Sequence, residues 1–150
     1  MSRADIAKEN FLNGCACAQA VFLAFSDVTG LDRGTAMKLS LPFGAGLGRL
    51  RLTCGAVSGA VAVLGSVLAK PEPDAGNKAE VYAAVQEFCR RFEKENKSLN
   101  CGELLRAAGL PAETKPSPEE RTAGYYARRP CPAIVYSAAK ILEEYLAERE

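Results

Sequence analysis

The chain has 150 residues with a nearly balanced charge, 19 Lys and Arg against 18 Asp and Glu, and it contains six cysteines and no histidine. This length favours one domain, residues 1–150, whose folding buries roughly 70% of the unfolded surface without help from disulfides. The balanced charge argues against nucleic acid as a partner, and the lack of histidine excludes Ser-His-Asp and Cys-His catalytic pairs, Cys/His zinc sites and histidine-ligated haem.

The N-terminal residues 1–10 interleave acids and bases, unlike the basic start and apolar run of a secretory signal. The most apolar stretch, residues 55–69, is too short to cross a bilayer and carries Ser58 and Ser66. We therefore expect a soluble cytoplasmic protein without a membrane partner. In that compartment a disulfide would be transient rather than structural.

The first third of the chain predicts three helices and a loop. Apolar spacing indicates a helix over residues 2–13, a second from near Cys15 to about residue 28, and a third over 33–41. Asp32 is positioned to cap the third helix, and Pro42 to end it. Glycines at alternate positions then indicate an irregular loop over residues 42–51.

The middle of the chain predicts a buried central helix over residues 54–70, apolar nearly all round. Gly55 and Gly59 leave one side of this helix thin, so that a neighbouring backbone can approach closely. Residues 78–97 follow as a long amphipathic helix. Its expected buried stripe consists of Val81, Tyr82, Val85, Phe88, Cys89 and Phe92.

The last third predicts a short helix over residues 101–108 capped by Asn100, and a capping-box turn of helix at residues 117–120. A terminal helix begins at Cys131, between two prolines that favour a first helical turn. No run alternates with the period of a strand. The fold class expected is therefore an all-α, single-domain bundle of about six or seven helices.

Most of the cysteines lie where a helix is expected to begin. The exposed N–H groups and the dipole of a helix start favour a thiolate, so such positions suit reactive sulfur. Cys89 is the exception, since it lies on the apolar stripe of its helix and is interpreted as an inert core residue. Cys15 and Cys17 are close enough to reach one metal or one third sulfur, whereas a disulfide between them would be strained. One of this pair could also simply pack.

Cys54 is the predicted attacking thiol, because Arg49 and Arg51 precede it and favour its ionised form. The adjacent glycine loop, residues 44–48, has three interpretations. It is a plain connector, an anion cradle built from successive N–H groups, or a device that lets a partner thiol or small substrate approach Cys54.

Several segments resemble a family of redox proteins named for the cysteine pattern C_GCAxxG_C_C. The segments are C-A-Q-A-V at 17–21, F-G-A-G at 43–46, C-G-A-V-S-G at 54–59 and N-C-G-E-L-L at 100–105, with Cys131 before the last helix. The resemblance selects Cys17, Cys54, Cys101 and Cys131 and leaves Cys15 and Cys89 as additions. Ala16 departs from the asparagine often found before the first cysteine. The resemblance implies a small helical protein with redox activity, and the chain has no C-x-x-C-H motif for haem.

Three functional hypotheses follow. In the first, Cys17, Cys54, Cys101 and Cys131 converge on one pocket for thiol–disulfide exchange or electron transfer with a redox partner, with Cys17 resolving the disulfide of Cys54. The protein would then be a thiol–disulfide oxidoreductase. In the second, the same four cysteines bind a metal ion or an iron–sulfur cluster. In the third, the protein is a non-catalytic helical interaction protein that forms a homodimer through Gly55 and Gly59.

Overall fold

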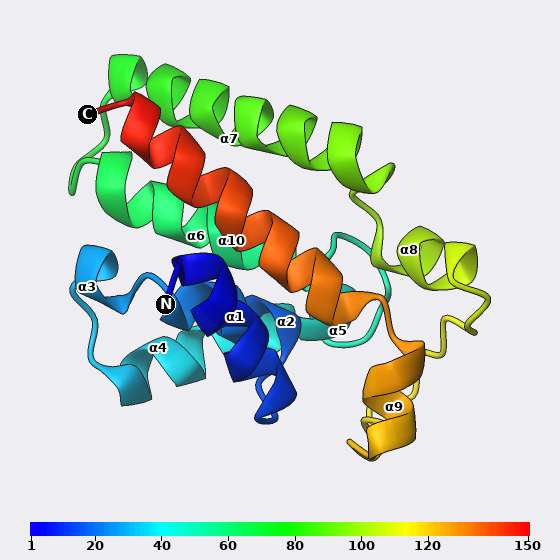
Figure 1. The fold of residues 1–150 in the computed structure, drawn as a ribbon. Helices are drawn as coiled ribbons and strands as arrows, with labels where there is room; N and C mark the ends of the chain where they lie inside the picture. The colour runs from blue at the N-terminus through cyan, green and yellow to red at the C-terminus, as the bar shows by residue number, and fades with distance from the viewer.

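Two long helices, α7 (Ala75–Asn96) and α10 (Cys131–Glu148), run along one side of the molecule, and the N-terminal helices lie against the other side of α10 and α6 (Figure 1). In this computed structural model, which describes residues 1–150, α1 packs most extensively against α10, and α2 packs most extensively against α6. The remaining elements are α1 (Arg3–Leu12), α2 (Cys17–Leu23), α3 (Ser26–Thr29), α4 (Arg33–Ser40), η1 (Leu41–Phe43), α5 (Gly44–Leu47), α6 (Gly55–Leu68), α8 (Cys101–Ala107) and α9 (Ala123–Arg128).

The predicted all-α fold is confirmed. The only β-type pairing is an isolated bridge between Thr53 and Asn100. Side-chain caps begin several helices, including two that the sequence predicted, because a cap oxygen accepts a hydrogen bond from a first-turn N–H that has no helical partner. Asp32 caps α4 by accepting from the Thr35 N–H, and Asn100 caps α8 by accepting from the Glu103 N–H.

The central helix α6 is confirmed near its expected bounds, and its thin face is used inside the chain. A methyl group at Gly59 would lie 2.6 Å from the carbonyl oxygen of Ala18, and one at Gly55 would lie 3.1 Å from the Ala18 nitrogen. The missing side chains therefore let α2 approach α6 closely. The hypothesis that Gly55 and Gly59 form a homodimer surface is wrong, because α2 already covers this face.

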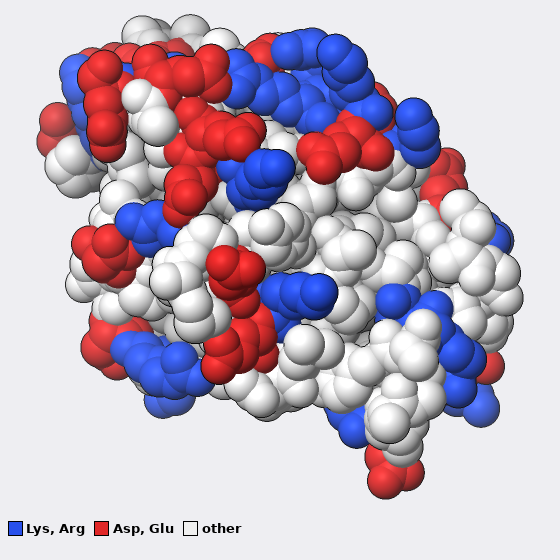
Figure 2. Space-filling view, viewed as in Figure 1, with Lys and Arg blue, Asp and Glu red and all other residues white.

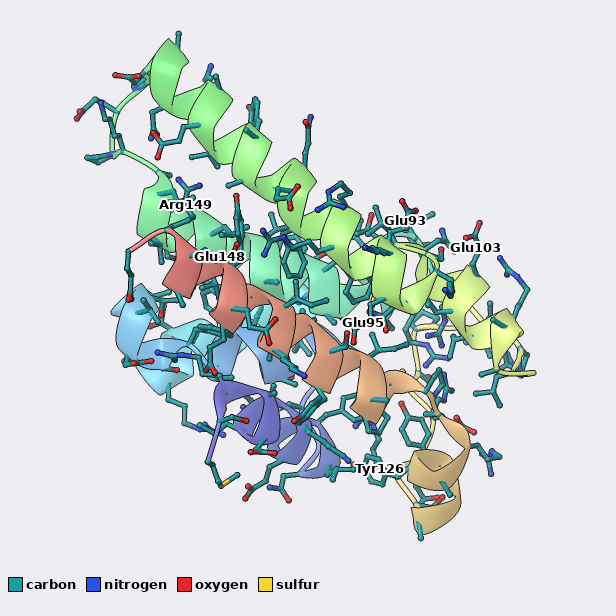
Figure 3. All side chains as sticks on the ribbon, turned by 45° about the horizontal axis from the view of Figure 1, so that its top comes forward. Glu93, Glu95, Glu103, Tyr126, Glu148 and Arg149 are labelled. Atoms are coloured by element: carbon teal, nitrogen blue, oxygen red, sulfur yellow. The ribbon has the colours of Figure 1, made fainter.

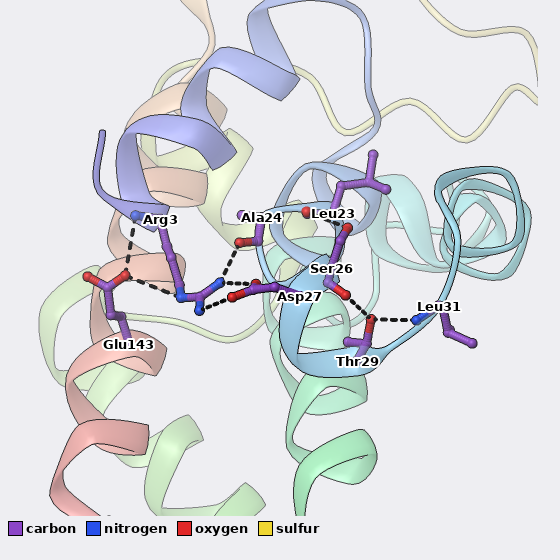
Figure 4. Close-up of polar contacts among 8 residues, drawn as sticks. All are labelled: Arg3, Leu23, Ala24, Ser26, Asp27, Thr29, Leu31 and Glu143. Carbon is purple, nitrogen blue, oxygen red and sulfur yellow. Dashed lines mark hydrogen bonds and ion pairs between the residues drawn. The ribbon is translucent and has the colours of Figure 1, made fainter.

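The predicted second helix is interrupted, and Figure 4 shows the contacts at the break. α2 ends at Leu23 and α3 begins at Ser26. The Arg3 guanidinium donates to the carbonyl oxygen of Ala24 at 2.9 Å and pairs with Asp27 at 2.7 Å. It thereby takes the place of the N–H that a continuous helix would supply to this carbonyl. The interruption depends on a residue far from it in sequence.

Two further expectations were wrong. Tyr82 is 61% exposed, because the face that α7 buries is centred on Ala84, Phe88 and Phe92. The predicted helical turn at residues 117–120 does not form. The carboxylate of Glu119 there pairs with arginines of the α9 region, and Thr122 caps α9 in its place.

Ion pairs lie on the outer face of the two long helices. Figure 3 shows Glu148 and Arg149 at the end of α10, facing α7, and Tyr126 on α9 near the other end of the molecule. Arg91 of α7 pairs with Glu148, and Arg149 pairs with Glu80 at 3.5 Å. Figure 2 shows acidic and basic groups interleaved over this region. None of the helices combines the length and the apolar composition needed to cross a membrane.

Candidate functional site at the cysteine pocket

Four cysteines lie at helix N-termini, as the sequence predicted. Cys17 is the first residue of α2, Cys101 of α8 and Cys131 of α10, and Cys54 is the residue that precedes α6. Three of them, Cys17, Cys101 and Cys131, line one cavity of about 380 Å³. The cavity size is within the usual range of small-molecule sites.

Cys54 is buried and does not line this cavity. It nevertheless lies close enough to Cys17, Cys101 and Cys131 for their charges to interact. Backbone hydrogen bonds hold its segment against the start of α8. The Cys54 N–H donates to the carbonyl oxygen of Leu99 at 2.8 Å, and the Cys101 N–H donates to that of Leu52 at 2.6 Å. These bonds bring Cys54 and Cys101 together although 46 residues, 55–100, lie between them in the chain.

A hydrogen-bonding interaction between the Cys17 and Cys131 side chains is the largest cause of the pKa shift of each thiol. This interaction lowers the pKa of Cys131, and the positive charges of Arg129, Arg121 and Arg51 lower it further against the opposing effect of burial. The same interaction raises the pKa of Cys17, and burial adds to the rise. Of the two thiols, Cys131 is therefore the one that ionises more readily, with the Cys17 thiol as the donor to its sulfur.

The expectation that Cys54 is the most readily ionised thiol was wrong. Burial raises the pKa of Cys54 to about 12, although first-turn N–H groups of α6 oppose the rise. The two arginines that precede it in sequence point elsewhere. Arg49 donates to the carbonyl oxygen of Lys115, and Arg51 donates to that of Glu113. Arg49 and Arg51 are therefore close to Cys54 in the sequence, but neither guanidinium is among the groups that shift its pKa.

Arg51 contacts the Cys101 sulfur instead. Its Nη1 lies 3.7 Å from the Cys101 sulfur, and this contact partly offsets the burial that raises the pKa of Cys101. Arg51 is itself only 8% exposed. A buried guanidinium beside a thiol stabilises the ionised sulfur more than an exposed one would, because the surroundings screen the charge less.

The glycine loop is a left-handed turn, not an irregular connector. Residues 45–49 all have positive φ, from 53° at Ala45 to 71° at Arg49. A side chain at Gly46 would lie 2.6 Å from the backbone nitrogen of Leu52 and 2.7 Å from Cβ of Cys101. The loop therefore comes closest to Cys101, whereas the sequence hypothesis placed it against Cys54. Left-handed turns cost about 1–2 kcal/mol for each residue other than glycine, so such a run requires support from its surroundings.

The two additional cysteines lie outside the cavity. Cys15 is 7% exposed and belongs to the hydrophobic core, and Cys89 is partly buried against that core on α7. Burial raises the pKa of both. The interpretation of Cys89 as an apolar packing residue agrees with this environment.

Three residues that the sequence did not indicate, Arg121, Tyr125 and Arg129, close the cavity from the C-terminal side. Arg121 donates to the carbonyl oxygens of Phe11 and Cys15 and lies 5.0 Å from the Tyr125 ring, and Arg129 lies 4.7 Å from the same ring. A signal was present in the sequence, since three arginines and two tyrosines are concentrated in residues 121–129, shortly before Cys131.

The donor set was also compared with the needs of a metal site. No three Cys, Asp or Glu side chains are arranged to hold one metal ion. The structure therefore adds no support to the all-cysteine metal or iron–sulfur site, which stays a prediction.

A family model described as "Putative redox-active protein (C_GCAxxG_C_C)" matches residues 15–145. The chain belongs to this family. The matched range includes all four cysteines at helix N-termini, together with the left-handed turn and the segment that closes the cavity. Comparisons with curated proteins and with solved structures gave no match.

Proposed function

We propose that this member of the redox-active C_GCAxxG_C_C family is a dithiol protein in which Cys131 attacks and Cys17 resolves. The observation that carries the proposal is that these two thiols line one cavity together with Arg129, Arg121 and Arg51, whose positive charges help to lower the pKa of Cys131. A thiolate is the nucleophile in disulfide exchange, and its partner must be within reach of the attacked sulfur.

The proposed reaction moves two electrons from the cysteine pair to a disulfide substrate. The Cys131 thiolate attacks one sulfur of the substrate, whose S–S bond breaks and releases one substrate thiolate. The Cys17 thiol then gives its proton to this released thiolate and attacks the Cys131 sulfur of the mixed disulfide. The second substrate thiolate leaves, and a Cys17–Cys131 disulfide remains. The reverse sequence reoxidises a substrate dithiol.

Cys101 and Cys54 have supporting roles in this proposal. Cys101 lines the cavity and contacts Arg51, so it is a second thiol that a substrate can reach. Cys54 is buried with a pKa of about 12, which keeps it protonated at neutral pH. We propose that Cys54 holds the start of α6 in place and does not attack. Cys131 therefore takes the role of attacking thiol that the sequence predicted for Cys54.

Alkylation kinetics test the assignment of the nucleophile. The reduced protein is treated with limiting iodoacetamide, and the modified cysteines are mapped by mass spectrometry as a function of pH. We expect Cys131 to react first and to remain reactive at lower pH than the other five cysteines. Cys17→Ala should slow this reaction, because it removes the donor that stabilises the Cys131 thiolate, whereas Cys89→Ala should leave it unchanged.

Mild oxidation tests the assignment of the pair. We expect the oxidised protein to lose two hydrogens and to yield one cross-linked peptide pair that contains Cys17 and Cys131. Neither Cys17→Ser nor Cys131→Ser should yield this product, and Cys89→Ser is the matched control. Preferential alkylation of Cys54, or an oxidised protein that never joins Cys17 to Cys131, would falsify the proposal. Elemental analysis of the same anaerobic sample tests the metal hypothesis in parallel.

A further inference from the structure

The thiol cavity has a pronounced positive charge that the whole chain does not have. Arg49, Arg51, Arg121 and Arg129 line it, and Glu119 is the single acidic residue among the lining side chains. The chain as a whole has a net charge of only +1. Figure 2 shows basic groups around the lobe at its lower right, where Figure 1 places α9. Charge has therefore been concentrated at the site.

Three of these guanidiniums lack a carboxylate partner. Arg49, Arg51 and Arg121 form no ion pair, and their hydrogen-bond acceptors are backbone carbonyls and the Cys101 sulfur. Arginines elsewhere behave differently, as Arg91 on α7, for example, pairs with both Glu87 and Glu148. Buried charges are usually paired, so the lack of a partner for Arg51 leaves the cavity short of negative charge.

The one acid in the cavity does not correct this shortage. Glu119 is already bound by Arg129 at 2.7 Å and by Arg128 at 3.2 Å. Arg49 shows the electrostatic effect of the excess, because burial and the like charges of Arg51 and Arg129 lower its pKa. The cavity would be stabilised by an anion that approaches these arginines.

We infer that the substrate of the thiol pair is a small disulfide that carries carboxylate groups. This inference rests on the proposed function and names its substrate class. Guanidinium groups bind carboxylates through paired, charge-assisted hydrogen bonds, and these contacts would hold one end of the substrate while its sulfurs reach Cys131. The cavity of about 380 Å³ suits a molecule of this size and is too small for a protein segment with its own fold.

The reaction is the exchange described above with the substrate specified. The Cys131 thiolate attacks the disulfide and releases one carboxylate-bearing thiolate, and Cys17 completes the protein disulfide and releases the second. The substrate gains two electrons, and the protein dithiol loses them. The positive cavity stabilises the departing thiolate as well as the bound carboxylate, because both carry negative charge where the arginines are concentrated.

Reactivity with a charge series tests the substrate class. The probes are 3,3′-dithiodipropionate, bis(2-hydroxyethyl) disulfide and cystamine, which have similar size and are anionic, neutral and cationic. Because the three probes differ in the pKa of the leaving thiol, each rate is divided by the rate of the same probe with a free small thiol. We expect this relative rate to be about tenfold or more higher with the anionic probe than with the neutral one, and lowest with cystamine. The advantage of the anionic probe should shrink as salt is added. Equal relative rates with all three probes would overturn the inference and leave the dithiol mechanism intact.

Binding of an unreactive analogue tests the anion site without any redox step. Octanedioate has the length of dithiodipropionate with carbon in place of sulfur, and octane-1,8-diol is its neutral counterpart. Octanedioate should slow alkylation of Cys131 in the reduced protein, and the diol should not. Protection by both compounds, or by neither, would contradict an anion site even if none of the disulfides reacts. A failure of disulfide reactivity alone would instead count against the proposed function.

Substitution of Arg49 localises the effect, since Arg49 is an unpaired arginine on the cavity that is only partly buried, unlike Arg51. Arg49→Gln should reduce protection by octanedioate and lower the ratio of anionic to neutral reactivity, whereas Arg49→Lys should retain most of both. The matched control is Arg90→Gln on α7, whose guanidinium pairs with Glu87 away from the cavity. Loss of the charge preference in Arg90→Gln, or its full retention in Arg49→Gln, would reject the assigned site.

Discussion

A helix N-terminus does not by itself make a thiol acidic in this protein. Cys54 and Cys131 both lie at the start of a long, apolar helix, yet the pKa of Cys54 is raised to about 12 and that of Cys131 is lowered. The difference arises from burial in the first case, and from the Cys17 hydrogen bond and nearby guanidiniums in the second. Local sequence predicted the helix starts, but it could not predict that the Cys54 sulfur is buried while the Cys131 sulfur lies near positive charge.

The raised pKa of Cys54 predicts that the folded protein loses stability at alkaline pH. The unfolded chain releases the Cys54 proton near pH 9, the ordinary value, whereas the folded chain holds it until about pH 12. Stability from this thiol is therefore complete below pH 9 and is lost as pH rises through that range, by up to about 1.4 kcal/mol per pH unit.

Urea unfolding at about pH 8 and about pH 10 checks this expectation. The wild-type free energy of unfolding should fall more between the two conditions than that of Cys54→Ala, which lacks the ionising group. The other raised thiols are present in both proteins, so the difference between the two falls isolates Cys54. Equal falls would show that Cys54 ionises as readily in the folded protein as in the unfolded chain.

At the scale of elements, the sequence predicted those helices whose boundaries are set locally. The starts of α4 and α8 depend on Asp32 and Asn100, which cap the following turn. The break before α3 depends on Arg3, which is far away in sequence, and sequence periodicity does not reveal such contacts. The left-handed turn was visible only as a group of glycines, because its hand is set by the packing of Gly46 against Cys101 and Leu52.

The contact between α2 and α6 predicts opposite effects for two glycines of one helix. Gly59→Ala places a methyl group 2.6 Å from the Ala18 carbonyl oxygen and should lower the free energy of unfolding by about 2 kcal/mol, because two backbones must move apart. Gly65→Ala meets no atom within 4 Å and should raise it by up to about 1 kcal/mol through helix propensity.

Denaturant unfolding of the two variants measures both effects. Because α2 begins at Cys17, we also expect Gly59→Ala to change the alkylation rate of Cys131, whereas Gly65→Ala should leave it at the wild-type value. A Gly59→Ala protein with wild-type stability would mean that α2 and α6 are not in the close contact described.

At the scale of the whole molecule, the candidate site is made where a segment without regular structure folds back on the helices. Residues 108–122 connect α8 to α9. Arginine side chains hold this segment to the rest of the chain by donating hydrogen bonds to backbone carbonyl oxygens. The helical bundle was predictable from apolar spacing. The cavity wall was not, because its position depends on Arg49, Arg51 and Arg121, whose acceptors follow no sequence pattern.

Arg121 holds residues 108–122 against the N-terminal part of the chain. It donates to the carbonyl oxygens of Phe11 and Cys15 and lies 4.4 Å from the Phe11 ring. Arg121→Gln should destabilise the closed arrangement by about 2 kcal/mol, since two charge-assisted hydrogen bonds are weakened. Limited proteolysis should then cleave residues 108–122 up to about 30-fold faster, the change in opening equilibrium that corresponds to this free energy. Arg128→Gln, which removes only an exposed ion pair with Glu119, is the control and should be cleaved at the wild-type rate.

The position of Tyr125 makes it an intrinsic fluorescent probe of the cavity. The chain has five tyrosines and no tryptophan, so tyrosine alone determines its ultraviolet emission. Tyr125 lines the cavity, with the guanidiniums of Arg121 and Arg129 5.0 and 4.7 Å from its ring, and it lies within range of the charges on Cys17 and Cys131. We expect its fluorescence to respond when the sulfur pair changes oxidation state, and a Tyr125→Phe protein to lose that response. Turnover can then be followed by the intensity of tyrosine fluorescence, without an added dye.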